Sequence, residues 1–256
     1  AITSAVDPQS ESFANNRAAM LELLGDVRLL EERVRAYSER ARPRFEARGQ
    51  MLPRDRVDLL LDRGAPFVEL STLAGLGMHD DDGNDNPLGG GGINGVGVVS
   101  GVRCMISASD SGIKGGTSTP MGLKKKLRSQ QIALENKLPT IALVESGGAN
   151  LLYQSELFVE GGRTFANQSR LSAAGIPQVT VVHGSSTAGG AYVPGLSDYV
   201  VVVRNRAKIF LAGPPLLKSA TGEIATDEEL GGADMHASIA GTAEYIADDD
   251  AQAIAV

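Results

Sequence analysis

The chain has 256 residues, of which 42% are hydrophobic, enough to bury one large core or two modest ones. Its formal net charge of -7 argues against a general role in binding nucleic acid, and its one cysteine, Cys104, excludes a disulfide framework or a cysteine-rich zinc module. No window approaches the roughly 18 apolar residues of a membrane-spanning helix, and the first residues lack the pattern of a signal peptide. We therefore expect a cytoplasmic protein.

The first 75 residues are rich in charge and predict helices. Residues 1–14 are polar, and we expect a disordered tail. Residues 15–48 carry apolar residues at helical spacing among many charges, which predicts a helix that Pro43 or Gly49 interrupts or ends. A shorter helix is expected over residues 51–61, with Pro53 in its first turn, and a strand over residues 67–70. Residues 15–75 thus form a helical extension.

Residues 76–94 contain several aspartates and four consecutive glycines, at positions 89–92, which predicts a flexible loop. Two alternatives concern ligands. The acids suggest calcium, but their spacing does not fit an EF-hand loop. The glycines suggest a phosphate cradle, but no lysine follows them in the Walker pattern, so a linker is favoured.

From residue 95 the chain becomes regular. A hairpin is predicted over residues 95–100 and 102–108, and a helix over residues 123–136. Strands are then expected at 139–145, 177–183, 199–203 and 208–212, with helices at 160–174 and 188–197 between them. This order predicts an α/β fold with a mainly parallel sheet and helical cover. Thr226 and Glu229 form a capping-box pattern, and residues 247–256 read as a helix that is just starting.

Two glycine pairs stand where a strand should end and a helix begin. Gly147-Gly148 follows the apolar run 140–144, and Gly189-Gly190 follows the run 179–182. Glycines at this point leave backbone N–H groups uncovered, which suits an anion or a developing oxyanion. The pairs lie about 40 residues apart, as one structural unit used twice would place them. The alternative is that both are tight strand-to-helix turns.

A serine hydrolase is a competing interpretation. Residues 184–188 nearly match the nucleophile elbow G-x-S-x-G, with Ala188 in place of the last glycine. Asp198 and His236 follow Ser186 in the order that hydrolases use. The further glycine pair after Ser186 argues against it, because an elbow does not need one.

Several charged residues have two interpretations. His183, at a strand end, is either a hydrogen-bonded core histidine or a catalytic group, and Glu145 is either a base or a strand-end acid bonded to backbone amides. Lys124 to Lys126, with Arg128, form either a solvated helix face or a contact for the phosphates of a large anionic ligand. Lys114 has the same two interpretations.

Six motifs, taken together in order, resemble one family. They are residues 114–117 (KGGT), 145–150 (ESGGAN), 186–194 (STAGGAYVP), 209–215 (IFLAGPP), 221–223 (TGE) and 230–236 (LGGADMH). With the stretch 52–61 they resemble the N-terminal half of the carboxyltransferase (β) subunit of biotin-dependent acyl-CoA carboxylases, of the methylcrotonyl, geranyl and propionyl type. The resemblance implies a crotonase-like fold, a spiral of ββα units, with residues 95–256 as the acyl-CoA-binding N domain.

The resemblance also implies a reaction. Carboxybiotin, delivered on a carrier protein, gives its carboxyl group to an acyl-CoA, whose thioester enolate is held by backbone amides. Gly147 and Gly148 would be the catalytic residues, biotin's own ureido group the base, and no metal would be needed in this chain. The positions implied to bind substrate are Lys114, Gly115, Gly116, Ala149, Thr187, Ala188, Gly189, Gly190 and Ala191.

The resemblance implies partners as well. Family members run to about twice this length, and their C-terminal biotin-side domain is absent from this chain. They act with a biotin carboxylase and biotin carboxyl carrier subunit, as a dimer at least and by resemblance a hexamer. The motif variants lean toward the methylcrotonyl and geranyl branch, but the segment 151–165 is shorter than the methylcrotonyl pattern, so substrate choice stays open. The alternatives are a decarboxylase or transcarboxylase of the same family, and a non-catalytic CoA-binding or assembly module.

Overall fold

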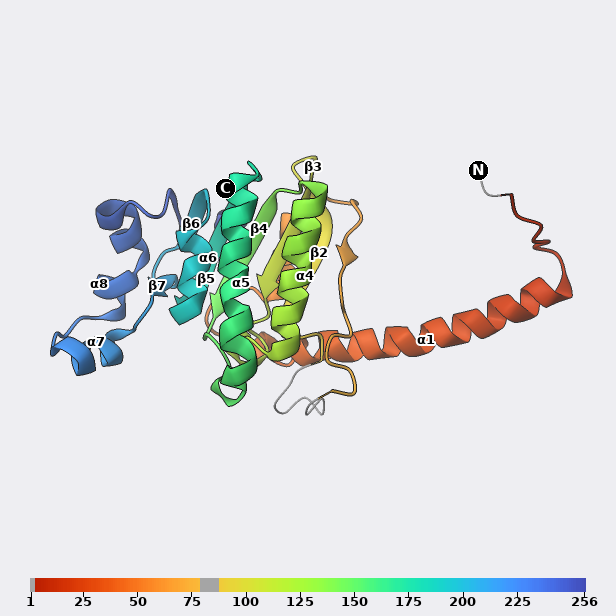
Figure 1. Cartoon of the computed structure of the whole chain (residues 1–256), viewed down its shortest axis with the longest axis horizontal. Coiled ribbons are helices and arrows are strands. Elements are labelled where there is room, and N and C mark those ends of the chain that lie inside the picture. The colour runs from red at the N-terminus through yellow and green to blue at the C-terminus, as the bar shows by residue number, and fades with distance from the viewer. Residues whose placement is uncertain (1–2, 79–87) are drawn as a thin grey trace.

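The computed structural model describes residues 3–78 and 88–256 (Figure 1). Helix α1 (Glu11–Glu39) extends away from the rest of the molecule, and only Val34 and Ser38 of its residues are buried. It begins at Glu11 because the Ser10 hydroxyl accepts a hydrogen bond from the Phe13 amide. The prediction of a disordered tail over residues 1–14 is therefore wrong for residues 11–14.

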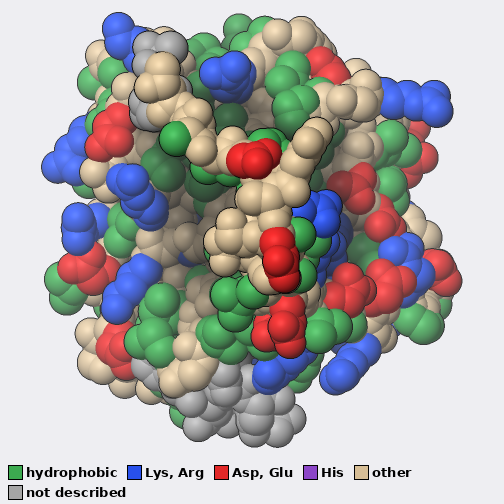
Figure 2. Space-filling view, turned by 90° about the vertical axis from the view of Figure 1, so that its right-hand side faces the viewer, with side chains coloured by type: hydrophobic (Ala, Val, Ile, Leu, Met, Phe, Trp, Pro, Cys, Tyr) green, Lys and Arg blue, Asp and Glu red, His purple; other side chains and the backbone are tan. Residues whose placement is uncertain are grey.

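The predicted break in the first helix is confirmed. Helix α2 (Arg42–Glu46) carries Pro43 in its first turn, and Gly49 follows it with a φ of 63°. Helix α3 (Pro53–Leu60) has Pro53 at its start, as predicted. In the view along α1, acidic and basic side chains are interspersed with hydrophobic ones over the molecular face (Figure 2).

One sheet organises the body of the molecule, in the order β1-β2-β3-β4-β5-β6-β8, with β7 paired to β5. Strands β1 to β3 pair antiparallel, and the pairs from β3 onward are parallel, which confirms the predicted mainly parallel sheet. The strands are β1 (Val68–Glu69), β2 (Gly92–Val99), β3 (Val102–Ser109), β4 (Thr140–Ser146), β5 (Gln178–Thr187), β6 (Tyr199–Val203), β7 (Lys208–Phe210) and β8 (Tyr245–Ala247).

Two strand predictions need correction. The expected loop over residues 76–94 is wrong for residues 92–94, which pair with β3 as the start of β2. Of that loop, residues 79–87, and with them the calcium alternative, lie outside the described residues. Strand β5 continues four residues beyond the predicted end at 183, so Ser186 lies within a strand.

Helices cover both faces of the sheet. Helices α4 (Pro120–Asn136) and α5 (Gln154–Ala173) lie side by side on one face (Figure 1). On the other face, Val57 of α3 and Ala253 of α9 (Asp250–Ala255) pack with Ile106, Leu143 and Val181 of the strands. The short elements are 3-10 turns η1 (Lys114–Gly116), η2 (Leu151–Tyr153) and η3 (Ala188–Ala191), helices α6 (Tyr192–Gly195), α7 (Pro214–Thr221) and α8 (Asp227–Gly231), and the π-helical turn η4 (Met235–Ala240).

The helix predictions differ from the structure mainly at their boundaries. Helix α5 begins at Gln154 instead of 160, and the helix expected over 188–197 is η3 followed by α6. The capping box of Thr226 and Glu229 starts α8, as predicted. Residues 250–255 form the expected C-terminal helix.

The sheet face beneath α4 and α5 carries small side chains. Alternate residues of a strand point to opposite faces, so Ser107, Ala142 and Thr180 face the helices, whereas Ile106, Leu143 and Val181 face the core under α3. Small residues on one face leave space between the sheet and its helical cover. That space is a cavity between the sheet and helices α4 and α5.

Candidate active site

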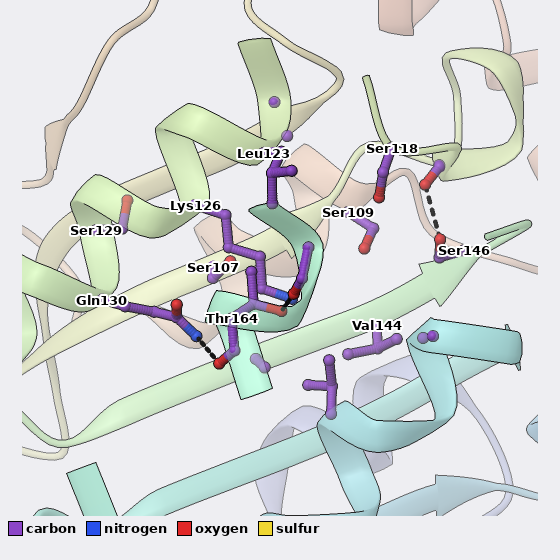
Figure 3. Close-up of a pocket in the computed structure, with 18 of the residues that line it drawn as sticks. Ser107, Ser109, Ser118, Leu123, Lys126, Ser129, Gln130, Val144, Ser146 and Thr164 are labelled. Carbon is purple, nitrogen blue, oxygen red and sulfur yellow. Dashed lines mark hydrogen bonds between the residues drawn. The ribbon is translucent and has the colours of Figure 1, made fainter. Parts of the chain in front are cut away.

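A cavity of about 600 Å³ lies between the sheet and helices α4 and α5 (Figure 3). Three loops meet at it, namely residues 116–118 after β3, residues 147–149 after β4, and residues 188–190 after β5. Because β3, β4 and β5 are parallel, these loops share one edge of the sheet. The repeated strand–glycine–helix unit in the sequence therefore builds a single site.

The predicted catalytic glycines lie in the β4 loop, and their amides already have acceptors. The Gly147 N–H donates to the Gly115 carbonyl at 2.9 Å, and the Gly148 N–H donates to the Ser146 hydroxyl at 3.2 Å. The Ser146 hydroxyl in turn donates to the Gly116 carbonyl at 2.9 Å, the bond between the two loops that is drawn in Figure 3. These bonds hold the β4 loop against the β3 loop.

The next amide along the chain is uncommitted. The Gly148 carbonyl accepts from the Ser118 N–H at 2.8 Å, and the Asn150 N–H donates to the Ser118 carbonyl at 3.0 Å. Ala149, between them, has no acceptor for its N–H among the residues that the structure describes. Gly148 has a φ of 95°, a conformation that glycine adopts without strain and that turns the chain at this point.

The β5 loop starts beside the β4 loop. Ser186 pairs with Ser146 in the sheet register, and the Ser186 hydroxyl donates to the Gly190 carbonyl at 3.0 Å. Gly189 stands at the start of η3, where an amide has no partner within the helical turn. The cavity is thus lined by two loops that each contain a backbone amide without an acceptor among the described residues.

The positions implied to bind substrate divide into two groups. Seven of the predicted residues line the cavity, namely Gly116, Gly147, Gly148, Ala149, Ala188, Gly189 and Gly190. Four do not line it, namely Lys114, Gly115, Thr187 and Ala191. A Cβ atom on Gly116 would lie 2.2 Å from the Glu145 carbonyl oxygen, so only glycine permits the two loops to approach this closely.

Sequence reasoning missed the wall of the cavity. Gly161 and Gly162 of α5 line it, and a Cβ atom on either would meet no heavy atom within 4 Å. Phe158 and Phe165, one turn away on each side, line the same wall. A glycine pair inside a helix is unfavourable, and this was the signal that these positions leave room for something else.

The three consecutive lysines of α4 have three different environments. Lys124 is exposed, whereas the Lys125 ammonium is buried and donates to the carbonyls of Gly89 and Gly92, at 3.2 and 2.7 Å. Lys126 lines the cavity, and burial lowers its pKa to about 8. Of the two interpretations, the solvated face holds for Lys124 and not for Lys125, whose acceptors are the carbonyls of Gly89 and Gly92.

A buried charged network lies behind the β4 loop. Arg56 donates to Glu145 at 2.7 Å and to Asp250 at 3.3 Å, and the Ser111 hydroxyl also donates to Glu145 at 2.8 Å. Asp250 lies 2.8 Å from Nδ1 of His183. Burial raises the pKa of Asp250, but the His183 contact and the Arg56 charge outweigh it and hold that pKa at about 2. Glu145 is therefore a partner of Arg56 rather than of backbone amides, and His183 is a hydrogen-bonded core histidine.

The serine hydrolase interpretation is contradicted by the geometry. Asp198 accepts from the Gln178 amide at the start of β5, eight residues or about 26 Å of extended strand from Ser186. His236 is bound to the Ile209 carbonyl and to Thr242. The three residues do not form a triad.

Residues 44–256 match the family model of the carboxyl transferase domain. The chain belongs to that family. It is 54% identical over 222 residues to the biotin-dependent 3-methylcrotonyl-coenzyme A carboxylase beta1 subunit of Mycobacterium tuberculosis, covering 86% of this chain and 41% of the relative.

Solved structures agree. The beta subunit of geranyl-CoA carboxylase from P. aeruginosa is 62% identical with a TM-score of 0.89, covering 100% of this chain and 47% of that one. The transcarboxylase 12S structure described with hydrolyzed methylmalonyl-coenzyme A bound is 26% identical with a TM-score of 0.80, covering 92% and 45%. The predicted crotonase-like fold and the family resemblance are confirmed, and the chain spans about half the length of these relatives.

Two further observations concern the residues described. No helix within residues 3–78 and 88–256 is long and apolar enough to cross a membrane. No group of three or more His, Cys, Asp or Glu side chains in the same residues is arranged to hold a metal ion.

Proposed function

We propose that this carboxyl transferase domain binds the acyl-CoA in a biotin-dependent carboxyl transfer and stabilises the thioester enolate with backbone amides. The observation that carries the proposal is the meeting of the β4 and β5 loops at one cavity, each with an amide at its rim. Preorganised amides stabilise a developing oxyanion without gaining or losing a proton. A good donor of this kind lowers the activation barrier by about 3–4 kcal/mol.

The hydrogen bonds change which amides we propose as donors. Because the Gly147 and Gly148 amides are bound to Gly115 and Ser146, the donors proposed are Ala149 and Gly189. Gly147 and Gly148 then act by setting the position of Ala149. Biotin, carried on a partner protein, would supply the activated carboxyl group and the base, which agrees with the absence of a suitably placed His or Glu among the described residues around the cavity.

The cavity has room for an acyl chain that is longer than a short, unbranched one. Its floor is formed by small side chains, and Gly161 and Gly162 leave its wall open. Relatives named for methylcrotonyl-CoA and geranyl-CoA are the most similar of those described above. We therefore propose a branched acyl-CoA of the geranyl type as the substrate.

The partners proposed are a biotin carboxylase and carrier subunit and further copies of this chain. The transcarboxylase 12S structure is described by its hexamer assembly, which supports an oligomer here. A transcarboxylase or decarboxylase would use the same acyl-CoA site, and the identity of the carboxyl donor separates these reactions.

The test uses the full-length subunit assembled with its biotin-bearing partner. Carboxyl transfer from labelled bicarbonate to acyl-CoA is measured for the parent protein, for Gly148→Val and for the control Gly101→Val. Both glycines have positive φ and open space around the Cβ position, but Gly101 lies in the β2–β3 turn. We expect loss of transfer only in Gly148→Val. Acyl-CoA binding without transfer in the parent protein would instead indicate a CoA-binding module.

A further inference from the structure

Lys126 is a half-buried cation at the cavity that the proposed chemistry does not use. Its side chain runs from α4 into the cavity, toward Thr164 of α5 and Ser107 of β3 (Figure 3). Within residues 3–78 and 88–256 it has no hydrogen bond and no ion pair, and burial alone shifts its pKa. An ammonium that is partly withdrawn from bulk water and has no partner in the protein is unfavourable, so its missing partner is expected to be part of a ligand.

The neighbouring Lys125, unlike Lys126, has hydrogen-bond acceptors within the protein. The Lys125 ammonium, on the same helix, has the Gly89 and Gly92 carbonyls as acceptors. Lys126 points into the cavity instead, where the nearby polar side chains are Ser107, Ser129, Gln130 and Thr164. The inner part of a largely apolar cavity is therefore polar and carries a positive charge.

The position of Lys126 along the cavity fixes which part of a ligand it meets. It lies six residues, or about 9 Å along the axis, from the start of α4 at Pro120. In the sheet, Ser107 is level with Ala142, and Gly147, just beyond the end of β4, follows Ala142 by five residues, or about 16 Å of extended chain. An acyl chain that starts from a thioester at the β4 loop and is long enough to span this distance would have its far end at Lys126.

We propose that Lys126 binds an oxygen atom at the far end of the acyl chain, so that the substrate is a branched acyl-CoA carrying a hydroxyl or carboxylate remote from the thioester. This inference rests on the proposed function and names the substrate class of the same site. The acyl chain of this substrate would be apolar where it passes Gly161 and Gly162 and polar at the end remote from the thioester.

The test measures binding by the full-length subunit, without turnover. Three acyl-CoAs of equal length and branching are compared, ending in a methyl, a hydroxyl or a carboxylate group. Hydrogen bonds to a charged donor predict that one of the oxygenated chains binds at least about tenfold more tightly than the methyl-ended chain. Equal or tighter binding of the methyl-ended chain overturns the proposal.

Two variants assign the preference to Lys126. Lys126→Met keeps the length of the side chain and removes the charge, so it should abolish the preference for oxygen and leave the methyl-ended ligand bound as before. Lys124→Met, on the exposed side of the same helix, should keep the preference. Equal weakening of all three ligands by Lys126→Met contradicts the proposal.

Binding at Lys126 and carboxyl transfer are measured separately, so either can fail without the other. If the oxygenated ligand binds through Lys126 but no acyl-CoA is carboxylated by the assembled enzyme, the subsite stands and the carboxyl transfer does not. If the methyl-ended acyl-CoA is both bound more tightly and carboxylated, the reaction stands and the subsite does not.

Discussion

Ser146 and Gly116 are joined by a 2.9 Å hydrogen bond from the serine hydroxyl to the glycine carbonyl, and the same hydroxyl accepts the Gly148 amide. One buried side chain thus connects the β3 loop to the β4 loop at the rim of the cavity. Because the Ala149 amide follows directly, its direction depends on this bridge. Ser146 thus positions the proposed oxyanion donor through this bridge.

Ser146→Ala is therefore expected to lower kcat of carboxyl transfer by about tenfold to a hundredfold, with a smaller change in KM, because a misplaced donor loses transition-state stabilisation. The loss of both bonds should also reduce the free energy of unfolding by about 1–2 kcal/mol. Steady-state kinetics and urea denaturation measure the two effects. Ser185→Ala, at an exposed position of the neighbouring strand β5, is the control. An unchanged kcat would show that the bridge does not position a catalytic amide.

Gly161→Phe should make the cavity shorter. A Cβ atom at this position has open space, so the protein should still fold. The aromatic ring would occupy the wall of the cavity, and KM for a geranyl-type acyl-CoA should rise by about tenfold or more, with short acyl-CoAs little affected. Gly25→Phe in α1, another helical glycine with open space, should leave both values unchanged. Equal KM changes for short and long chains would contradict the acyl-wall role.

The glycine pairs and the strand order allowed the location of the site to be predicted from sequence, because strand–glycine–helix units have a strong local signature. The commitment of the Gly147 amide was not predictable, since its acceptor, Gly115, is brought there by the pairing of β3 with β4. The same applies to Lys126, whose pattern of three lysines resembles a solvated face. Side-chain partners distant in sequence depend on packing that periodicity does not encode.

Arg56 illustrates this limit and gives a stability prediction. It is fully buried and joins Glu145 to Asp250, residues separated by 105 positions in the chain. Arg56→Met removes the cation that joins the half-buried Glu145 to the buried Asp250, and only Arg206, 3.7 Å from Asp250, remains. The free energy of unfolding should therefore fall by about 3 kcal/mol. Arg35→Met, whose partner Glu32 is exposed, should cost less than about 1 kcal/mol. Urea denaturation compares the two, and equal effects would contradict the buried network.

Asp250 gives a pH dependence. Its pKa is held at about 2, below its ordinary 3.8, so the unfolded chain binds the proton more readily than the folded one. The resulting stability is present above pH 4 and is lost as the pH falls toward 2. Its size is about 2 kcal/mol. Denaturation of the parent protein and Asp250→Asn between pH 5 and pH 2 should show this loss only in the parent, and parallel curves would refute it.

The most direct measurement is a structure of the full-length subunit with a bound acyl-CoA thioester, read for the atoms around the thioester oxygen. The account predicts that this oxygen lies within about 3.2 Å of the Ala149 amide and of an amide at the start of η3, with the acyl chain running under α5 past Gly161. A thioester oxygen held by side chains, or an acyl chain outside the cavity, would contradict the central claim.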